Sequence, residues 1–530
     1  MDKPPSDAEL KRMMQSVAFR AARGQRPPEQ HAPSLIDDLP PEHGRVMPSC
    51  AIAQVLGAAP ATLARGTELV TRGRPACRYR TVYDVTLLPV AITSARFLPC
   101  LDMPAALGLP PECRSEIVIA IESIDPALPL DVAAATPLRV YIDAPPALRS
   151  ALHDALFMHA VCTCLYSDRQ WCQLAVPPFA AVGCADNEAL LPPRQGDEAG
   201  LRLLAEYFAF SAKFDFFDID LQPVLARCPA GTHRLVLHVA LPQLDAAEAL
   251  QALSAATLRL GCTPVVNLFE RVAEPVRVSA GHNAYPLRIA QGDEARVALF
   301  SVDAVAHDGN VLAPFDGPRG SRNTGCWLLR HADTAAGVQD TISFVDGEQR
   351  PLDLRCGTVA VRVTCTNAEP PAGLRIGHPG GDLTGQGGAA RLLMVPTAAR
   401  PNAHPWHVLA ARSPTERRLS RQGLPALLNL LRLYDAPAQL LAGIVGLDHH
   451  GAAAWLRFPQ GAAWMHGIEV RVTIDDVAFA RRGVFVFAQV MDRFLAYYAQ
   501  PHSFTQLVVV DEAGRELVRC TARAATSLPL

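Results

Sequence analysis

Apolar and polar residues alternate strictly along a segment near the C-terminus, from Gly467 to Asp475. The apolar positions are Ile468, Val470, Val472 and Ile474, and the polar positions are Glu469, Arg471, Thr473 and Asp475. Successive side chains of a β-strand point to opposite faces. This period of two therefore predicts a strand with one buried and one solvated face.

The hydrophobic period changes a few residues later. Apolar residues recur there at steps of three and four, at Phe487, Val490, Met491, Phe494, Leu495 and Tyr498. This spacing places them on one stripe of a helix and leaves Gln489, Asp492 and Arg493 on its solvated side. A second apolar run, at 507–510, turns over at 511–514 into another short apolar run, which predicts a hairpin.

The remaining pattern predicts a multidomain α+β chain that is rich in antiparallel β-sheet. Strands are expected at 81–92, 116–122, 137–142, 234–239 and 296–302, and helices at 6–24, 147–165, 200–208 and 424–434. The Gly-rich segment 377–388 predicts a mobile loop, and the Pro-rich acidic segment 191–198 predicts a boundary or a long surface loop. We expect a short N-terminal helical segment at 1–45 and domains at 46–185, 186–330 and 331–530.

Composition narrows the class of protein. A chain of 530 residues is too long to fold around one hydrophobic core, so several domains are expected. Because only 19% of its residues are charged, it is not expected to be disordered. The net charge of -3 offers no electrostatic footprint for nucleic acid or an anionic membrane surface. The polar N-terminus lacks the apolar core of a signal peptide, and no apolar run is long enough to span a bilayer, so no membrane insertion is expected.

Asp218 and Asp220 are the first candidates for chemistry. Two residues apart in a strand, their carboxylates would share one face, where they could bind a divalent cation or act as an acid/base pair. The alternative is a solvated strand edge, which we favour because no further carboxylate or histidine pattern converges on them.

Cysteines and histidines suggest metal binding only weakly. The 14 cysteines are mostly scattered, as expected for buried free thiols in a reducing compartment. Four cysteines lie closer together, at Cys162, Cys164, Cys172 and Cys184, but their spacing is not that of a zinc site. In a helix at 147–165, the thiols of Cys162 and Cys164 would be badly placed to bind one metal ion together. The histidines at 404, 407, 449 and 450 have no ligand partner nearby in sequence. With no nucleophile-elbow, phosphate-loop or dinucleotide motif either, we expect no metal, no cofactor and no enzymatic activity.

Six longer motifs resemble one protein family in its own order along the chain. They are RGTEL at 65–69, CRYRTVYDVT at 77–86, EYFAFSAKFDFFDID at 206–220, CTPVVNLFERVAEPVR at 262–277, VTCTN at 363–367, and the alternating and helical stretch at 467–511. Together they resemble the TssF family (also called VasA or ImpG), a baseplate subunit of the bacterial type VI secretion system. The segment 6–24 is similar to a helix of that family, which normally follows further helical sequence, so we expect a shortened N-terminus.

The resemblance implies a structural protein with a fold similar to phage baseplate wedge proteins. It implies a wedge built with a second copy of the chain and TssG, which recruits TssK and TssE and surrounds the spike and hub protein VgrG. It also implies a cytoplasmic baseplate that docks on the membrane complex at the inner membrane. Two alternatives remain: a wedge protein of a phage-like contractile particle, and a β-rich hydrolase or carbohydrate-binding protein that uses the paired aspartates.

Two groups of residues are the candidate interface of such a wedge. The first, Asn267, Phe269, Glu270 and Arg271, is expected in a shaped loop between strands, where polar residues often serve binding. The second, Asp492, Arg493, Phe494 and Phe504, belongs to the C-terminal helix and its aromatic-rich end, which also holds Tyr497 and Tyr498. The aromatic residues of this second group are expected mainly in the core and alternatively in a subunit contact. Asp492 and Arg493, expected to be exposed, are the better candidates for pairing between subunits.

Overall fold

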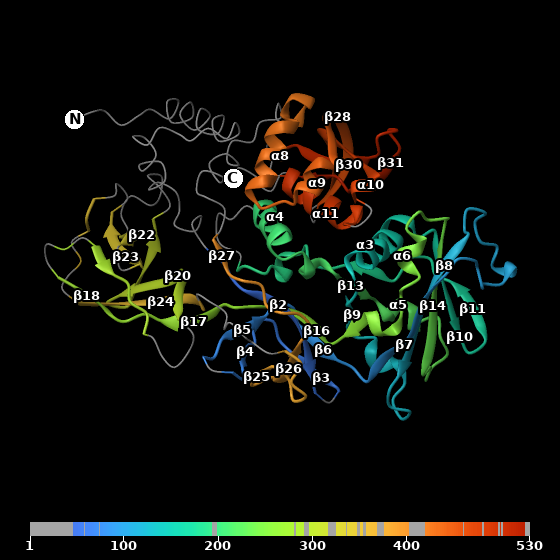
Figure 1. Ribbon diagram of the computed structural model, residues 1–530, viewed down its shortest axis with the longest axis horizontal. Coiled ribbons are helices and arrows are strands. Elements are labelled where there is room, and N and C mark those ends of the chain that lie inside the picture. Colours follow the sequence, from blue (N-terminus) through green and yellow to red (C-terminus); the bar gives the residue numbers. More distant parts are fainter. Residues whose placement is uncertain are drawn as a thin grey trace. The chain divides into compact units, whose positions relative to one another are not determined.

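A computed structural model describes residues 46–57, 59–73, 75–192, 199–279, 282, 284–290, 296–315, 325–334, 337–346, 350–352, 354, 357–367, 376–401, 419–458, 461–479, 482–496, 499 and 502–524. The helix predicted at 6–24 and most of the Pro-rich segment lie outside these residues. The chain forms two compact units (Figure 1). Unit 1 comprises Met1–Ala53, Gly66–Thr81 and Val265–Ser413, and unit 2 comprises Gln54–Arg65, Val82–Pro264 and Pro414–Leu530.

Two sheets pack face to face in unit 2. Their strand orders are β11-β10-β14-β8-β7 and β12-β13-β9-β15, and all their pairings are antiparallel. The strands are β7 (Val90–Leu98), β8 (Ser115–Ser123), β9 (Leu138–Ile142), β10 (Cys162–Ser167), β11 (Gln170–Gln173), β12 (Phe179–Ala181), β13 (Phe216–Ile219), β14 (Arg234–Leu241) and β15 (Leu258–Leu260). A small two-stranded antiparallel sheet of β3 (Ala61–Leu63) and β6 (Val85–Leu87) also belongs to this unit.

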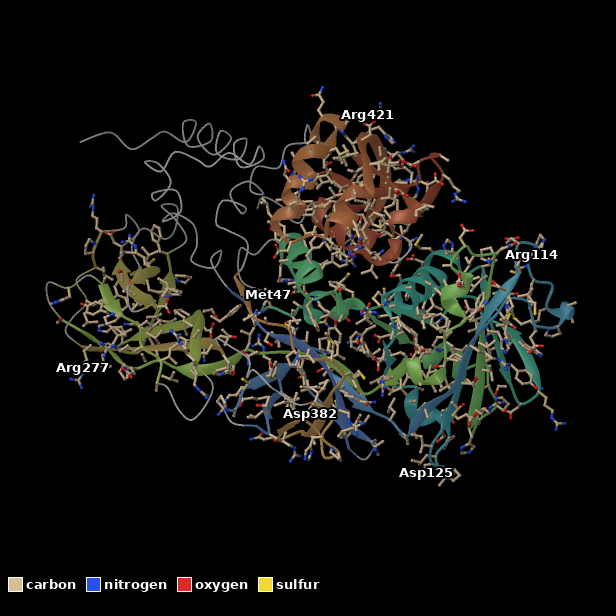
Figure 2. All side chains as sticks on the ribbon, in the orientation of Figure 1. Met47, Arg114, Asp125, Arg277, Asp382 and Arg421 are labelled. Carbon is tan, nitrogen blue, oxygen red and sulfur yellow. The ribbon has the colours of Figure 1, made fainter. Side chains whose placement is uncertain are left out.

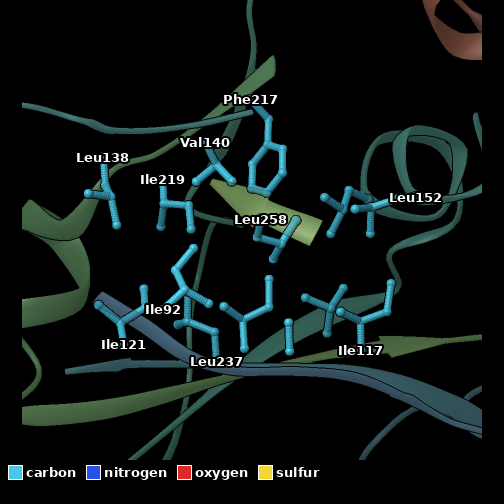
Figure 3. Close-up of a cluster of buried hydrophobic side chains, with 14 of the residues drawn as sticks. Ile92, Ile117, Ile121, Leu138, Val140, Leu152, Phe217, Ile219, Leu237 and Leu258 are labelled. Carbon is cyan, nitrogen blue, oxygen red and sulfur yellow. The ribbon is translucent and has the colours of Figure 1, made fainter. Parts of the chain in front are cut away.

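One hydrophobic cluster fills the space between these two sheets. Ile121 and Leu237 of the first sheet face Val140 of the second, and Leu152 closes one side (Figure 3). Leu152 comes from α3 (Pro146–Asp154), and α5 (Leu221–Leu225) and α6 (Ala247–Leu250) add further side chains. Alternate residues of β8 and β14 point into this core, and residues between them, such as Val118 and Val236, are buried on the other face of the sheet.

The C-terminal part of unit 2 is an α/β layer. Its sheet has the order β28-β29-β30-β31, with β32 beside β30. The strands are β28 (Ile444–Phe458), β29 (Gly461–Ile474), β30 (Phe504–Val510), β31 (Glu516–Arg519) and β32 (Arg523–Ala524), and the helices are α8 (Leu424–Leu433), α9 (Ala438–Ala442), α10 (Asp476–Phe479) and α11 (Val484–Leu495). Because β29 and β30 are parallel, the chain between them crosses over through α10 and α11. The strand, helix and hairpin predicted here are confirmed.

Helix α11 is packed on more than one side. It lies against α4 (Ala199–Ala209) as well as β30, and a Cβ atom added at Gly200 of α4 would come within 2.5 Å of the carbonyl oxygen of Arg493. The carboxylate of Asp154 accepts hydrogen bonds from the N–H groups of Val484 and Phe485, at 3.1 and 2.9 Å. These bonds satisfy two of the donors that the start of a helix leaves unpaired.

Unit 1 contains a closed barrel and a large sheet. The barrel order is β16-β2-β26-β25-β4-β5, from strands β2 (Cys50–Leu56), β4 (Glu68–Thr71), β5 (Arg78–Thr81), β16 (Cys262–Val266), β25 (Leu383–Gly385) and β26 (Gly388–Leu392). The sheet order is β17-β24-β20-β21-β22-β23-β19, with β18 beside β24. Its strands are β17 (Phe269–Val272), β18 (Val276–Val278), β19 (Ala284–Pro286), β20 (Val297–His307), β21 (Asn310–Pro314), β22 (Cys326–Thr334), β23 (Gly337–Val345) and β24 (Gly357–Asn367), and β1 (Val46–Met47) pairs β27 (Arg400–Pro401).

The β-rich α+β class is confirmed, and three local predictions are corrected. The helix expected at 147–165 is shorter: α3 continues as a π-helical turn at Ala155–His159, and from Cys162 the chain is strand β10, which pairs with β14 and β11. The strand expected at 81–92 is divided into β6 and β7, after β5 ends at Thr81. The Gly-rich segment expected as a mobile loop forms the barrel hairpin β25–β26. None of the described helices is long and apolar enough to cross a membrane.

Candidate functional site

The two candidate catalytic aspartates have separate structural partners. Asp218 lies on β13 opposite Arg139 of β9 and accepts from its Nε and Nη2, at 2.8 Å each. Asp220 caps α5, where its Oδ1 accepts from the N–H of Gln222 at 3.0 Å. Strand β13 lies between β12 and β9, so the expected solvated strand edge is wrong. Because the guanidinium of Arg139 binds both oxygens of Asp218, the two aspartates are not arranged as an acid/base pair.

Arg139 is the centre of a larger polar network in unit 2. Its Nη2 also donates to Glu188 Oε1 at 3.0 Å, and its guanidinium lies 4.8 Å from the ring centroid of Tyr83. The second oxygen of Glu188 accepts from the N–H groups of Gly183 and Ala185, at 2.7 and 3.1 Å. Burial raises the pKa of Tyr83 well above its ordinary value. Every group of this network is used in holding strands and turns together, as expected of a structural element.

A fully buried ion pair extends the same network. The Nζ of Lys213 contacts Oε2 of Glu206, whose Oε1 accepts from the N–H of Leu191 at 2.9 Å. The hydroxyl of Tyr83 donates to the backbone oxygen of Lys213 at 2.8 Å. The pair joins α4 to the short helical turn at Ser211–Phe214, and neither side chain has exposed surface.

The cysteine and histidine candidates that the structure describes have separate surroundings. In the described part of the chain, no group of three or more histidine, cysteine, aspartate or glutamate side chains is placed to hold a metal ion. Burial raises the pKa of Cys113 to about 11, which disfavours the thiolate that binds metals. His449 Nδ1 contacts the backbone oxygen of Leu419 at 3.2 Å and His450 Nε2 contacts Glu469 Oε1 at 3.1 Å, so the adjacent rings have different partners. The histidines at 404 and 407 lie outside the described residues.

The first predicted interface group is only partly exposed. Asn267 is buried, where its Nδ2 donates to the backbone oxygen of Arg78 at 2.7 Å and its Oδ1 accepts from the N–H of Asn367 at 2.6 Å. The chain from Phe269 onward is strand β17 and not the expected loop, and Phe269 packs into the core of the large sheet. Glu270 is exposed and Arg271 is half-buried. Of this group, these last two side chains retain solvent-accessible surface.

The second predicted interface group is mostly core. Asp492 is only 1% exposed and accepts from Nε of Arg523, so its expected exposure is wrong. Burial raises the pKa of Asp492, although Arg523 acts in the opposite direction. Phe494 and Phe504 are fully buried, as the core interpretation predicted. Arg493 remains half-buried, and its Nη1 donates to the backbone oxygen of Gln489 at 2.8 Å. The tyrosines at 497 and 498 lie outside the described residues.

Two exposed tryptophans were missed by the sequence analysis. Trp455 on β28 and Trp464 on β29 lie directly opposite each other, and their side chains are 66% and 54% exposed. The sequence carries no period-two signal for them, because Trp455 and Leu456 are adjacent apolar residues, as are Trp464 and Met465.

Comparisons with known proteins agree over nearly the whole chain. The family model described as "Type VI secretion system, TssF" matches residues 2–527. The chain is 26% identical to the type VI secretion system component TssF1 of Pseudomonas aeruginosa strain PAO1 over 576 residues, covering 98% of this chain and 92% of that protein. Its fold matches a chain of the type VI secretion system TssK-TssF-TssG baseplate subcomplex, solved by cryo-electron microscopy, with TM-score 0.70, 24% identity and 98% coverage of both chains. It also matches a chain of the baseplate complex from the type VI secretion system, with TM-score 0.56, 18% identity and coverage of 99% and 94%.

Proposed function

The chain belongs to the TssF family of type VI secretion systems, and on that premise we propose that it is a structural subunit of the baseplate. The observation that carries the proposal is the fold match along 98% of the chain to a subunit of a TssK-TssF-TssG baseplate subcomplex. A match of this extent leaves no additional described domain in which a separate activity would have to be sought. The protein acts by holding other subunits in place.

The proposed partners are TssG and TssK, with a second copy of this chain completing the wedge. The wedge also recruits TssE and surrounds the spike and hub protein VgrG. The assembly is cytoplasmic and docks on the membrane complex at the inner membrane. The whole-chain similarity to TssF1 supports these proposals, because a subunit of similar length and fold can present the same faces.

A mechanical role agrees with the chemistry of the described residues. Asp218, the aspartate that a hydrolase would need, is held by two hydrogen bonds from Arg139. The buried pair of Lys213 and Glu206 joins two elements of unit 2, and neither side chain has exposed surface. Large interfaces and rigid packed bodies are what a contractile assembly needs, and reactive groups are not. We therefore propose that the protein has no enzymatic activity.

The test is co-expression of the full chain with TssG and TssK from the same gene cluster, followed by size-exclusion chromatography with light scattering. We expect one complex that contains all three proteins, whose mass gives the number of copies of this chain. Elution of this chain alone, with TssG and TssK in a separate peak, would contradict the proposal.

A further inference from the structure

The β28–β29 hairpin is longer than the sheet that supports it. The two strands pair from Ile444 with Ile474 to Phe458 with Gly461, whereas β30 pairs with β29 only from Ile468 to Thr473. The described residues of 451–467 therefore extend past the sheet as a two-stranded ribbon, here named the arm. A two-stranded ribbon is marginally stable in water by itself, so a long one is usually held by something that covers it.

One face of the arm carries the two tryptophans. Their ring centroids are 5.7 Å apart with an interplanar angle of 65°, the edge-to-face arrangement that aromatic pairs prefer. The strand register places them on the same face as Leu447 and Val472, which are buried in the sheet. The core-facing side of the sheet thus continues outward along the arm, and at the tryptophans it meets solvent.

The charge of the arm has one sign. No aspartate or glutamate occurs between 451 and 467, and the charged residue there is Arg457, with His466 as the titratable one. Both lie on the tryptophan face, because Arg457 is two residues from Trp455 and His466 is two residues from Trp464. Arg457 is exposed, and it forms no ion pair with an acidic residue in the part of the chain that the structure describes. An apolar face next to an unneutralised cation is complementary to an apolar groove with a carboxylate at its rim.

We propose that the arm is a docking element that inserts Trp455 and Trp464 into an apolar groove of a different baseplate subunit, with Arg457 paired to a carboxylate at the rim of that groove. The proposal rests on the proposed function, since it assigns the wedge contact to a specific element. Tryptophan and arginine are the residue types most enriched at the energetic centres of protein interfaces. An exposed pair of indoles can also remove roughly 150–250 Å² of surface from water per ring.

A second copy of this chain is a poorer occupant of the same face. Two copies could pair through a twofold axis that places their β28 edges side by side in antiparallel fashion. Such an axis leaves each face of the sheet on its own side, so an odd-numbered residue of one β28 would lie opposite an odd-numbered residue of the other. Arg457 would then face one of Leu447, His449, Gly451, Ala453 or Trp455, none of which is acidic. The charge would remain unpaired in every such register, and this favours a partner of different sequence.

The experiment compares the full chain and four variants in a binding titration against the purified TssK–TssG subcomplex. We expect the double variant W455A/W464A to weaken binding on the order of thirtyfold or more, because truncating such anchors removes most of the energy of a contact. Arg457→Glu should also weaken binding, whereas Arg457→Lys should weaken it less. The matched control is the double variant I124A/V176A, which truncates two exposed apolar side chains elsewhere in unit 2 and should bind as the unchanged chain does.

The outcomes separate the two proposals. No binding of the unchanged chain to TssK–TssG would overturn the proposed function. Full binding of both W455A/W464A and the unchanged chain would overturn the docking role of the arm and leave the proposed function standing. Self-association of the unchanged chain that W455A/W464A abolishes, with TssK–TssG binding intact, would overturn the choice of partner. Unfolding in urea should be similar for the variants and the unchanged chain, since the substituted side chains are exposed.

Discussion

The Nζ of Lys213 and the Oε2 of Glu206 form an ion pair in which neither side chain has any exposed surface. Removing two charges from water is unfavourable, and this pair is retained because Glu206 also accepts the N–H of Leu191. The contact joins α4 to the turn that precedes β13. It therefore fixes the helix on which α11 packs.

Replacing one partner of this pair should be strongly destabilising. We expect Glu206→Gln to lower the free energy of unfolding by about 3–5 kcal/mol, because it leaves the ammonium group of Lys213 buried without a countercharge. The measurement is urea unfolding followed by circular dichroism. The control is Glu122→Gln, which breaks the more exposed pair with Arg234 and should cost less than about 1 kcal/mol. Equal losses in the two variants would contradict the structural role of the buried pair.

His153 should be a site where a less polar side chain stabilises the protein. It is buried on α3, and neither of its ring nitrogens has a hydrogen-bond partner. Burial, assisted by Arg149, lowers its pKa to about 4. We expect His153→Leu to raise the free energy of unfolding at pH 7.5 by about 1–3 kcal/mol, because an unsatisfied buried polar group is removed.

The gain from His153→Leu should grow as the pH falls from about 6.5 to about 4. Within that window the unfolded chain protonates His153 near its ordinary pKa, while the folded chain does not protonate it until about pH 4. Protonation of His153 therefore stabilises the unfolded state of the unchanged chain as the pH falls. The variant has no imidazole at this position, so its stability does not fall for this reason. Urea midpoints measured at several pH values would show it, and a difference independent of pH would argue against a buried neutral imidazole.

Gly200 should not accept a side chain, although it lies in a helix. Replacing glycine by alanine in a helix usually stabilises it by about 1 kcal/mol. At this position, however, the added Cβ would come within 2.5 Å of Arg493 O and 2.9 Å of Phe494 Cα, both backbone atoms of α11. We expect Gly200→Ala to destabilise the protein by about 1–3 kcal/mol in thermal unfolding. Gly73→Ala is the control, since no atom lies within 4 Å of a Cβ there.

Asp382 should be essential to the order of the Gly-rich segment. Its Oδ1 accepts the N–H groups of Gly377 and His378 and its Oδ2 accepts that of Leu392, all at 2.8 Å, in the barrel where Figure 2 labels it. Asparagine keeps one acceptor and turns an amide N–H₂ toward donors. We expect Asp382→Asn to cost about 1–3 kcal/mol and to increase proteolytic cleavage between 376 and 392. Unchanged cleavage kinetics would mean that the β25–β26 hairpin does not depend on this carboxylate.

The sequence by itself determined the elements whose apolar residues follow one strict period. Strand β29, helices α4, α8 and α11, and the β30–β31 hairpin were predicted from local spacing, since a side chain's direction within one element depends only on backbone geometry. The ordered motifs also determined the family, which the family model confirms.

The tertiary structure decided which polar residues are buried. Asp492 lies beside the apolar stripe of α11 and was expected in solvent, but the helix is covered by α4 and β30 and the carboxylate is paired with Arg523. Glu469 was expected on a solvated face, yet it is buried, where Arg519 and Arg471 donate to it at 2.6 and 2.8 Å. Cys162 and Cys164 lie in strand β10 and not in the expected helix, because β10 pairs with β14 on one side and with β11 on the other. Each of these outcomes depends on a partner far away in sequence, and local periodicity holds no information about such a partner.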